Sequence, residues 1–581
     1  MADTRLTGSD KRALLLWISC GVLGLVFAER YFFRAFPEAS VDFKVSRNEA
    51  QKRARGFVEG LGEDLHGYQS TITFQVDDNA KTYLERELGL QEANRLMAAE
   101  LNIWFWEVRF FKPQQEEEYR VRVSPAGNVV AYRHKVEEAR SAKSLSREEA
   151  LAAAKEFLGT KLDVNFDRWN FLPEEANSEA RPNRMDWSFT WERKNFKAKD
   201  APYRLVVGLQ GDRIGSTQEF LQVPEAWIRA YQKLRSTNNL YGSLALIPYG
   251  FLLGAAVWIG VSLWRQGKTS WAPALKIGGI AALLFYFMEL NDWNSVRAGY
   301  DTHADYTAFV IKNLVFLLLF AVGNAVLISL VMPAGEPLYR EAHAAFLRLT
   351  KAFTARGIRS KEFFCSSVVG VSLAAAHIGF ITAFYLVGNR LGVWAPQDIK
   401  YSDIVNTPLP WIAGIAIGVL AATNEEFTFR LFAIPFLQKM TGSRVLAVIL
   451  PAFFWSFLHS NYPQEPGYIR GIEVGLMGIV AGLVMLRWGI IATLIWHYTV
   501  DASLVGMLLI RSDNLYFKIS GIVVGLGAVV PLAWSGISYL TRGSFEAVDD
   551  LENGAVPVGE IALERRPEPA KVTAAASASR R

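Results

Sequence analysis

Long apolar runs constrain this chain more than any other feature, because each is close to the length that a membrane-crossing helix needs. A helix requires about 20 mostly apolar residues to cross about 30 Å of hydrocarbon. One run lies near the N-terminus, and the others lie between about 240 and 540 of the 581 residues. We therefore predict a polytopic all-α membrane bundle of about ten transmembrane helices. The predicted spans are about 13–33, 240–264, 271–290, 308–333, 365–388, 409–434, 444–460, 471–487, 489–510 and 519–540.

The basic residues of the loops predict the orientation of this bundle. Cytoplasmic loops of membrane proteins carry an excess of lysine and arginine. Richer and poorer loops alternate, so we predict a multi-pass protein of the cell membrane, with both termini cytoplasmic and residues 38–237 extracytoplasmic. The richer loops are 11–12, 265–268, 334–364, 439–444, 487 and the C-terminal tail, and the poorer ones are 292–305, 389–408, 461–468 and 511–516. The net charge of only +5 does not indicate a nucleic-acid partner.

These patterns divide the chain into six parts. The first part is either a cleaved signal peptide or an anchor, and the aromatic residues Tyr31 to Phe33 that extend its apolar run favour the anchor. Residues 334–364 form either a surface helix on anionic lipid or a solvated loop. The parts are 1–37 (N-terminal signal anchor), 38–140 and 141–237 (two α+β repeats), 238–364 (helices two to four and the basic segment), 365–541 (membrane core) and 542–581 (disordered tail).

The region 38–237 repeats internally. Ser46 to Ala50 recurs as Ser146 to Ala150, and the serine–glutamate spacing of both predicts a capping box that opens a helix. Downstream turns at Gly127-Asn128 and Gly211-Asp212 predict hairpins. We expect two tandem α+β modules, each a helix followed by a small antiparallel sheet. They resemble the PepSY-type modules found on extracytoplasmic proteins, although a shared framework of aromatic residues explains the repeat without any function.

Charged side chains within the apolar runs are the candidate functional residues. Placing a charge at bilayer depth costs at least a few kcal/mol, so such residues usually pair and have a function. At 1.5 Å per residue, Glu425 and His459 lie roughly 21–23 Å from the cytoplasmic edge, and His497 roughly 15 Å. The set therefore has the depth to converge on one cavity. Its members are Glu425, Glu426, Arg430, His459, His497 and Asp501.

Spacing predicts how these side chains pair. Glu426 and Arg430 are four residues apart and share one helix face, as do His497 and Asp501. Glu425 points about 100° away from Glu426, although the fork of Arg430 can also reach it. A lone intramembrane histidine is usually a packing residue, and we read His377 in that way.

Several chemistries suit this set. A carboxylate near a second carboxylate can act as a general base, and imidazoles can share a water proton or stabilise an oxyanion. Glu425, His459 and His497 are also a zinc ligand set with one open position. The pattern requires no cofactor, and zinc stays open. Ion or proton transport, or a structural polar core, uses the same residue types.

The ordered motifs resemble a known family. Glu425-Glu426-x-x-x-Arg430, Trp455-x-x-x-His459 and His497-x-x-x-Asp501 are similar to the three motifs of the CPBP intramembrane proteases, also called the Abi or type II CAAX prenyl endopeptidase group. The resemblance covers about 365–510. Trp455 stands where the family usually has phenylalanine, and Asp501 stands where it often has asparagine.

The resemblance implies an intramembrane peptidase. By position, Glu425 and His459 would activate water, Glu426 and Arg430 would support the site, and His497 with Asp501 would face the oxyanion. The family is described both as metal-dependent and as metal-free. The implied partners are lipid and a membrane-associated or lipidated protein or peptide, with a ligand of residues 38–237 as a further candidate. A non-catalytic immunity protein that binds a toxic peptide and an ion- or proton-coupled transporter are the alternatives.

Overall fold

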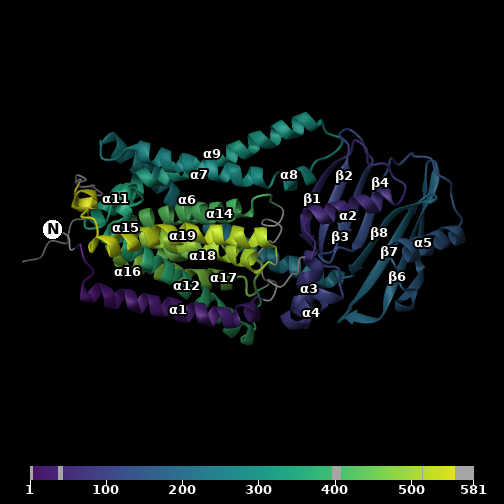
Figure 1. The fold of residues 1–581 in the computed structure, drawn as a ribbon, viewed down its shortest axis with the longest axis horizontal. Coiled ribbons are helices and arrows are strands. Elements are labelled where there is room, and N and C mark those ends of the chain that lie inside the picture. The colour runs from purple at the N-terminus through teal and green to yellow at the C-terminus, as the bar shows by residue number, and fades with distance from the viewer. Residues whose placement is uncertain (1–3, 37–43, 396–406, 513, 556–581) are drawn as a thin grey trace, which may run out of the picture.

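The computed structural model describes residues 4–36, 44–395, 407–512 and 514–555. A bundle of long helices forms one end of the molecule, and a sheet domain forms the other (Figure 1). Among the described residues, nine helices are long and apolar enough to cross a membrane. They are α1 (Gly8–Ala35), α6 (Glu225–Arg265), α7 (Trp271–Asn291), α9 (Tyr306–Ala342), α12 (Lys361–Arg390), α14 (Pro410–Glu426) continued by η3 (Phe427–Phe432) and α15 (Ala433–Thr441), α17 (Ile469–Trp488), α18 (Ile490–Arg511) and α19 (Leu515–Arg542).

The prediction of a full span over 444–460 is wrong. Helix α16 (Arg444–Phe457) has 14 residues, which rise about 21 Å and fall short of the hydrocarbon thickness. The chain leaves the helix at Phe457 and continues through turns to Tyr468. Pro463 and Pro466 lie in these turns and cannot donate the amide bonds of a helix. His459 therefore lies in an irregular segment, residues 458–468, which we call the histidine loop.

A single glycine separates α17 from α18. Gly489 has φ +81°, a conformation that side-chain-bearing residues rarely adopt. The amide of Ile490, the first residue of α18, donates to the hydroxyl of Tyr339 at 3.1 Å. The boundary predicted between these two spans is confirmed. Because one residue separates the helices and the Ile490 amide is bonded to Tyr339, the start of α18 is fixed relative to α9.

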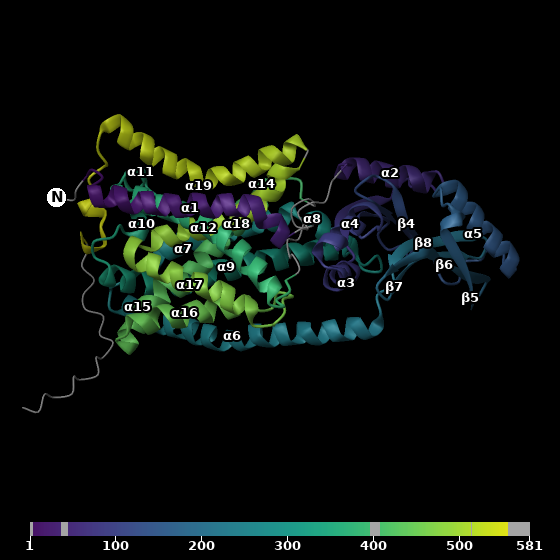
Figure 2. The same ribbon diagram turned by 90° about the horizontal axis from the view of Figure 1, so that it is seen from below.

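Helix α1 packs closely along α12. A Cβ atom placed on Gly24 would lie 2.6 Å from the Cα of Ala376, and one placed on Gly379 would lie 2.6 Å from the Cα of Gly24. Small residues permit such close backbone approach between membrane helices. The N-terminal helix is thus an integral part of the bundle surface (Figure 2).

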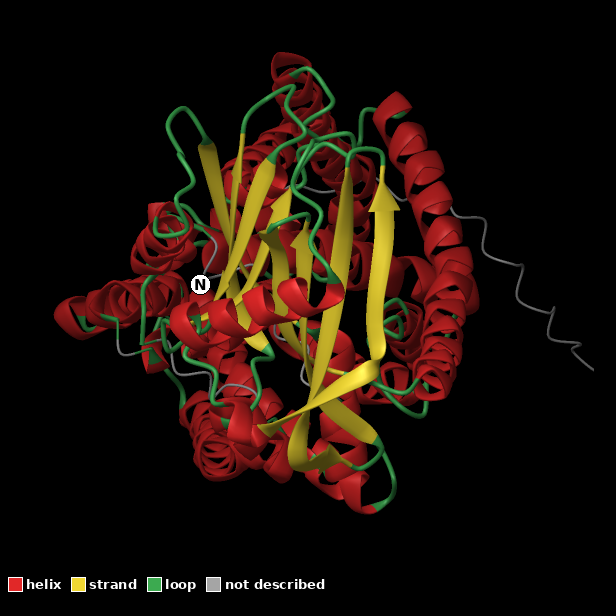
Figure 3. Cartoon of the chain, turned by 90° about the vertical axis from the view of Figure 1, so that its right-hand side faces the viewer, coloured by secondary structure: helices red, strands yellow, loops and turns green. Residues whose placement is uncertain are grey.

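The sheet domain contains one antiparallel sheet of eight strands in the order β1-β2-β3-β4-β8-β7-β6-β5 (Figure 3). The expected pair of small sheets is absent from the described residues, because β4 pairs with β8 through Tyr132 and Thr217. The strands are β1 (Gln69–Val76), β2 (Trp104–Phe111), β3 (Glu118–Val123), β4 (Val129–Lys135), β5 (Trp169–Arg181), β6 (Arg184–Ala198), β7 (Ala201–Gln210) and β8 (Arg213–Leu221). Both predicted hairpins, β3–β4 and β7–β8, are confirmed.

Two of the domain's helices begin at the predicted serine caps. The capping box of α5 (Arg147–Lys161) is complete, with Ser146 and Glu149 bonded reciprocally. At α2 (Arg47–Glu59) the Ser46 hydroxyl accepts from the amide of Glu49, but the Glu49 carboxylate pairs with Arg53. Two further helices, α3 (Asp78–Leu88) and α4 (Leu90–Ala99), follow β1 and precede β2 in the chain.

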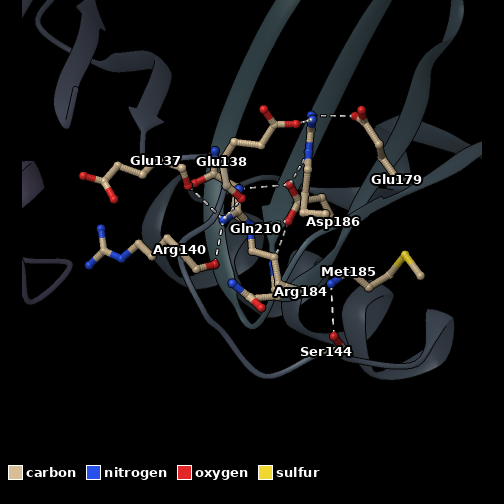
Figure 4. A network of polar contacts seen from close by, with 12 residues as sticks. Glu137, Glu138, Arg140, Ser144, Glu179, Arg184, Met185, Asp186 and Gln210 are labelled. Carbon is tan, nitrogen blue, oxygen red and sulfur yellow. Dashed lines mark hydrogen bonds and ion pairs between the residues drawn. The ribbon is translucent and has the colours of Figure 1, made fainter.

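One buried arginine holds the segment between β4 and α5, which joins the two halves of the sheet. Arg184 Nη1 donates to the carbonyl oxygens of Glu137 and Glu138 at 3.1 Å and of Arg140 at 2.8 Å. Its Nε donates to Asp186 at 2.9 Å (Figure 4). One guanidinium thus satisfies the backbone oxygens of a segment that has no regular structure of its own.

The sheet domain contacts loops at one end of the bundle. Arg109, paired with Glu118, donates to the carbonyls of Ala298 and Tyr300 at 3.0 and 2.6 Å, just after α8 (Trp293–Ala298). Arg86 forms a 2.5 Å ion pair with Glu465 of the histidine loop. Two loops assigned by their composition to the same side as residues 38–237 therefore touch that region.

The basic segment 334–364 continues α9 to Ala342 and then forms the short helices α10 (Leu349–Ala352) and α11 (Ala355–Ile358). The tail was expected to be disordered from 542 onward, but its described part packs on this segment. The amide of Arg348 donates to the carbonyl of Leu551 at 2.9 Å, and Leu551 is buried. Residues 556–581 lie outside the described part.

Candidate active site

The helix that carries the first motif changes its winding at the motif. Helix α14 ends at Glu426, and Phe427–Phe432 form a π-helix before α15 begins. Such turns widen the helix by one residue and occur often at functional sites. The Thr428 hydroxyl donates to the carbonyl of Asn424 at 2.8 Å, which satisfies a backbone oxygen at the transition.

A fully buried ion pair underlies the site. Arg430 Nη1 lies 2.9 Å from Glu426 Oε1, and the same oxygen lies 2.9 Å from Nδ1 of His497 on α18. The Glu426 side chain is completely buried, and that of Arg430 is 2% exposed. The predicted pairing of Glu426 with Arg430 is confirmed. Its carboxylate also fixes the ring of His497, a residue on another helix.

Glu425 is the meeting point of both imidazoles. Its Oε2 lies 3.6 Å from Nε2 of His497 and 3.9 Å from Nε2 of His459. The indole Nε1 of Trp455 donates to the same oxygen. Residues of α14, α16, the histidine loop and α18 thus converge on one carboxylate.

The remaining predicted residue, Asp501, lies on the exposed side of His497. Its Oδ2 is 3.7 Å from His497 Nε2. The side chains of Glu425, His459 and Asp501 are 28%, 23% and 25% exposed, whereas that of His497 is 8% exposed. The structure therefore brings all the predicted residues together. Glu426, Arg430 and His497 form a buried lower half of the site, and Glu425, His459 and Asp501 form a partly exposed upper half.

Aromatic side chains shape the lower half. The Arg430 guanidinium lies 4.1 Å from the centre of the Trp455 ring and 5.8 Å from that of Trp496. We had expected its fork to reach Glu425 as well, but Trp455 donates to that carboxylate instead. The indole that replaces the usual phenylalanine therefore supplies a hydrogen bond that phenylalanine cannot make.

The structure contains a second buried polar cluster that was not predicted from the sequence. Glu473 of α17 is completely buried, and its Oε2 lies 2.5 Å from Arg470 Nη1. His377 of α12, which we had read as a packing residue, has its Nε2 3.9 Å from Oε1 of Glu473. The signal was available, because Arg470 and Glu473 are charged residues three positions apart at the start of an apolar run, as unusual as Glu425 and Arg430.

The donor set around Glu425 is spread more widely than a zinc ion requires, because among the described residues only a group in the sheet domain has its ligand atoms all within 4.8 Å of one another. Ligands of tetrahedral zinc at about 2.0 Å stand about 3.3 Å from one another. The two imidazole Nε2 atoms lie 3.6 and 3.9 Å from one Glu425 oxygen, and the three ligand atoms are not all within 4.8 Å of one another. The Nδ1 atoms of His497 and His459 face Glu426 and the carbonyl of Trp455 at 2.9 and 3.1 Å. Zinc-binding histidines usually have such hydrogen-bond partners, and so do catalytic histidines that work without a metal. These two contacts therefore do not distinguish the two kinds of site.

The group with ligand spacing lies in the sheet domain. Oxygen or nitrogen atoms of Glu63, Glu117 and His134 lie within 4.8 Å of one another. Burial lowers the pKa of His134. Burial alone would raise the pKa of Glu117, but Arg140 and His134 outweigh it and lower that pKa. Arg140 lies 2.5 Å from Glu117 and Arg213 lies 3.4 Å from Glu63, so each carboxylate already has an arginine partner.

Comparisons with known proteins agree with the resemblance of the motifs. Residues 407–503 match the family model described as type II CAAX prenyl endopeptidase Rce1-like. The segment contains all the predicted site residues. The sporulation-killing factor biosynthesis protein SkfC of Bacillus subtilis (strain 168) is 20% identical over 503 residues, which cover 85% of this chain and 95% of SkfC. No solved structure shows a significant match.

Proposed function

Since residues 407–503 are of the type II CAAX prenyl endopeptidase kind, we propose that this membrane protein is an intramembrane peptidase. The reaction is hydrolysis of a peptide bond by a water molecule activated at Glu425 and His459. One observation carries the proposal: both imidazoles point their Nε2 atoms at a single, partly exposed carboxylate oxygen.

The separation of Glu425 and His459 suits a shared water. At 3.9 Å, Oε2 and Nε2 are too far apart for a direct hydrogen bond. A water between them can donate to both. In the proposed step the water oxygen adds to the carbonyl carbon while Glu425 takes a proton. That proton then passes to the departing amine, so the products are a carboxylic acid and an amine.

His497 is placed to face the oxyanion. Glu426 accepts from its Nδ1, so a proton on Nε2 as well makes the ring an imidazolium that can donate to the developing negative charge. Asp501, 3.7 Å from Nε2, orients and charges the ring. Arg430 pairs with the buried Glu426 beneath the site.

A zinc-dependent version of the reaction would need the same three residues to stand closer together than they do in this structure. Glu425, His459 and His497 would hold the ion, which would supply a polarised water. Glu426 and the carbonyl of Trp455 would keep the two rings oriented in either case. Dialysis against a chelator, followed by metal analysis and an activity assay, distinguishes the two versions.

The proposed substrate is a membrane-associated or lipid-anchored protein or peptide that enters between helices. The family description names prenylated substrates, although a large exported domain suggests an envelope setting where prenylated C-termini are not expected. We propose that the sheet domain is extracytoplasmic, that both termini are cytoplasmic, and that this domain binds substrate or another ligand. The name of SkfC links that protein to biosynthesis of a killing factor, which favours making such a factor over resisting one.

The experiment is a comparison of new protein N-termini in cells with the wild-type protein and with Glu425→Gln. Cleavage products present in the wild type and absent in the variant support the peptidase. Identical sets of termini, with both proteins folded and equally abundant, reject it. Glu341→Gln, which alters a carboxylate paired with Lys439 several turns away, is the matched control.

The same variants separate the alternative functions. A non-catalytic protein that neutralises a toxic peptide would still protect cells as Glu425→Ala and His459→Ala. A transporter would show ion- or proton-coupled flux in liposomes that these substitutions abolish, with no new peptide terminus.

A further inference from the structure

Behind the proposed site lies the second charged cluster, which the reaction above does not use. Arg470 and Glu473 begin α17, and Glu473 is completely buried. His377 and Tyr385 of α12 face Glu473 from the neighbouring helix. Burying charges within the bundle is costly, so a pair retained there needs a reason beyond packing.

Arg470 links this cluster to His459. Its guanidinium lies 5.4 Å from the centre of the Tyr462 ring, and that ring stacks at 18° on the ring of His459, with centroids 6.5 Å apart. The amide of Tyr462 also contacts the carbonyl of His459 at 3.4 Å. Arg470 therefore braces the turn of the histidine loop that carries the imidazole.

The charge of Arg470 acts on the open half of the site. Its side chain is 23% exposed, like those of His459 and Asp501, whereas its partner Glu473 is 1% exposed. Arg470 lies close enough to interact electrostatically with both His459 and Asp501. The groups that face it are Glu473 on its own helix, His377 and Tyr385 on α12, Tyr462 and His459 on the histidine loop, and Asp501 on α18.

We propose that Arg470, fixed by Glu473, is a positioning residue that holds His459 opposite Glu425. The proposal rests on the proposed peptidase function for its kinetic consequence, but the position of His459 can be measured without it. The histidine loop is held near His459 by turn bonds, among them the His459 amide to the Ser456 carbonyl at 3.0 Å, and Nδ1 of His459 lies 3.1 Å from the carbonyl of Trp455. These contacts fix the backbone and one ring nitrogen, and a cation anchored on a buried carboxylate adds a constraint from the Tyr462 side of the ring.

The decisive variant removes the whole pair. Replacing a buried ion pair by apolar residues of similar volume is often neutral for stability, so Arg470→Met with Glu473→Leu should fold. We expect its melting temperature to stay within a few degrees of the wild type and its kcat to fall roughly 10- to 100-fold, with KM nearly unchanged. Arg470→Lys keeps the positive charge but loses the planar guanidinium group. We expect kcat to fall because His459 is held less firmly, and we expect the pH optimum to stay in place because the charge is unchanged. The matched control is Lys439→Met with Glu341→Leu, which removes a 2.7 Å pair elsewhere in the bundle.

A second readout does not depend on turnover. The rate at which diethyl pyrocarbonate modifies His459, measured by mass spectrometry against His303, should rise severalfold in both Arg470 variants. A wild-type kcat in the double variant, or an unchanged His459 rate in either Arg470 variant, overturns the proposal. If no peptidase activity is found in the wild type, the proposed function fails while the labelling experiment still decides whether Arg470 positions His459.

Discussion

His497 and Glu426, 71 positions apart in the chain, meet at 2.9 Å between Nδ1 and Oε1 in a buried contact. The same oxygen receives Arg430, so one carboxylate joins α18 to the π-helical turn after α14. The contact fixes which nitrogen of His497 faces the open side of the site. Of the two adjacent glutamates, Glu426 therefore serves stability and Glu425 serves the proposed chemistry.

Glu426→Ala should destabilise the protein more than Glu425→Ala does. The first change leaves Arg430 buried without its partner, which typically costs about 3–5 kcal/mol. Glu425 is 28% exposed, so its loss should cost far less stability while abolishing cleavage. Thermal unfolding in detergent, combined with a peptidase assay, checks both effects. Equal losses of stability in the two variants would contradict the division into a structural and a reactive carboxylate.

Gly24→Leu should separate α1 from α12. A Cβ atom on Gly24 would lie 2.6 Å from Ala376 Cα, so the helices must move apart, at a cost of about 1–3 kcal/mol or more. Gly323 of α9 is the control, because a Cβ atom there meets nothing within 4 Å. Melting temperatures of the two leucine variants test the contact, and equal values would show that α1 does not depend on it.

The ion pair between Arg86 and Glu465 should couple the sheet domain to the histidine loop. The two side chains are 32% and 40% exposed, so the pair contributes at most about 1 kcal/mol to stability. Its effect on the loop should nevertheless lower kcat several-fold in Arg86→Glu or Glu465→Arg, and the charge-swapped double variant should recover. Lack of recovery in the double variant would argue against a direct coupling. Arg229→Glu, which breaks an exposed pair on α6, should leave kcat unchanged.

Acidification should loosen the end of α9 through His343, which follows the membrane-spanning part of that helix. Burial, assisted by Arg444, lowers the pKa of His343 to about 4. The unfolded chain, with an ordinary pKa near 6.5, takes up the proton first as the pH falls. The stability from this group is therefore complete above about pH 6.5 and is lost toward pH 4, by at most about 1.4 kcal/mol per pH unit.

His343→Phe tests that dependence. Its ring can keep the stacking on Phe346, where the centroids now lie 5.2 Å apart, but it cannot take up a proton. The variant should lose less stability than the wild type between pH 7 and pH 5, as measured by thermal unfolding. Parallel pH curves for the two proteins would assign the acid sensitivity to other groups.

The candidate site could be found in the sequence because charge is rare in apolar runs. Glu425, Arg430 and His497 stand out for that reason, and helical spacing correctly paired Glu426 with Arg430. Arg470 and Glu473 met the same criterion but belonged to no known motif. The histidine loop was missed because the apolar run of α16 continues past Phe457, whereas the prolines that end the helix follow several residues later.

Hydropathy and local spacing by themselves determined the membrane bundle, the paired hairpins and which residues are candidates for the site, since each depends on neighbours within a few turns of the chain. Only the tertiary structure decided that β4 joins β8 into one sheet, that Trp455 rather than Arg430 holds Glu425, and that Arg470 braces His459. These contacts join segments far apart in the chain. Packing between whole elements selects them, and no local pattern of residues encodes that choice.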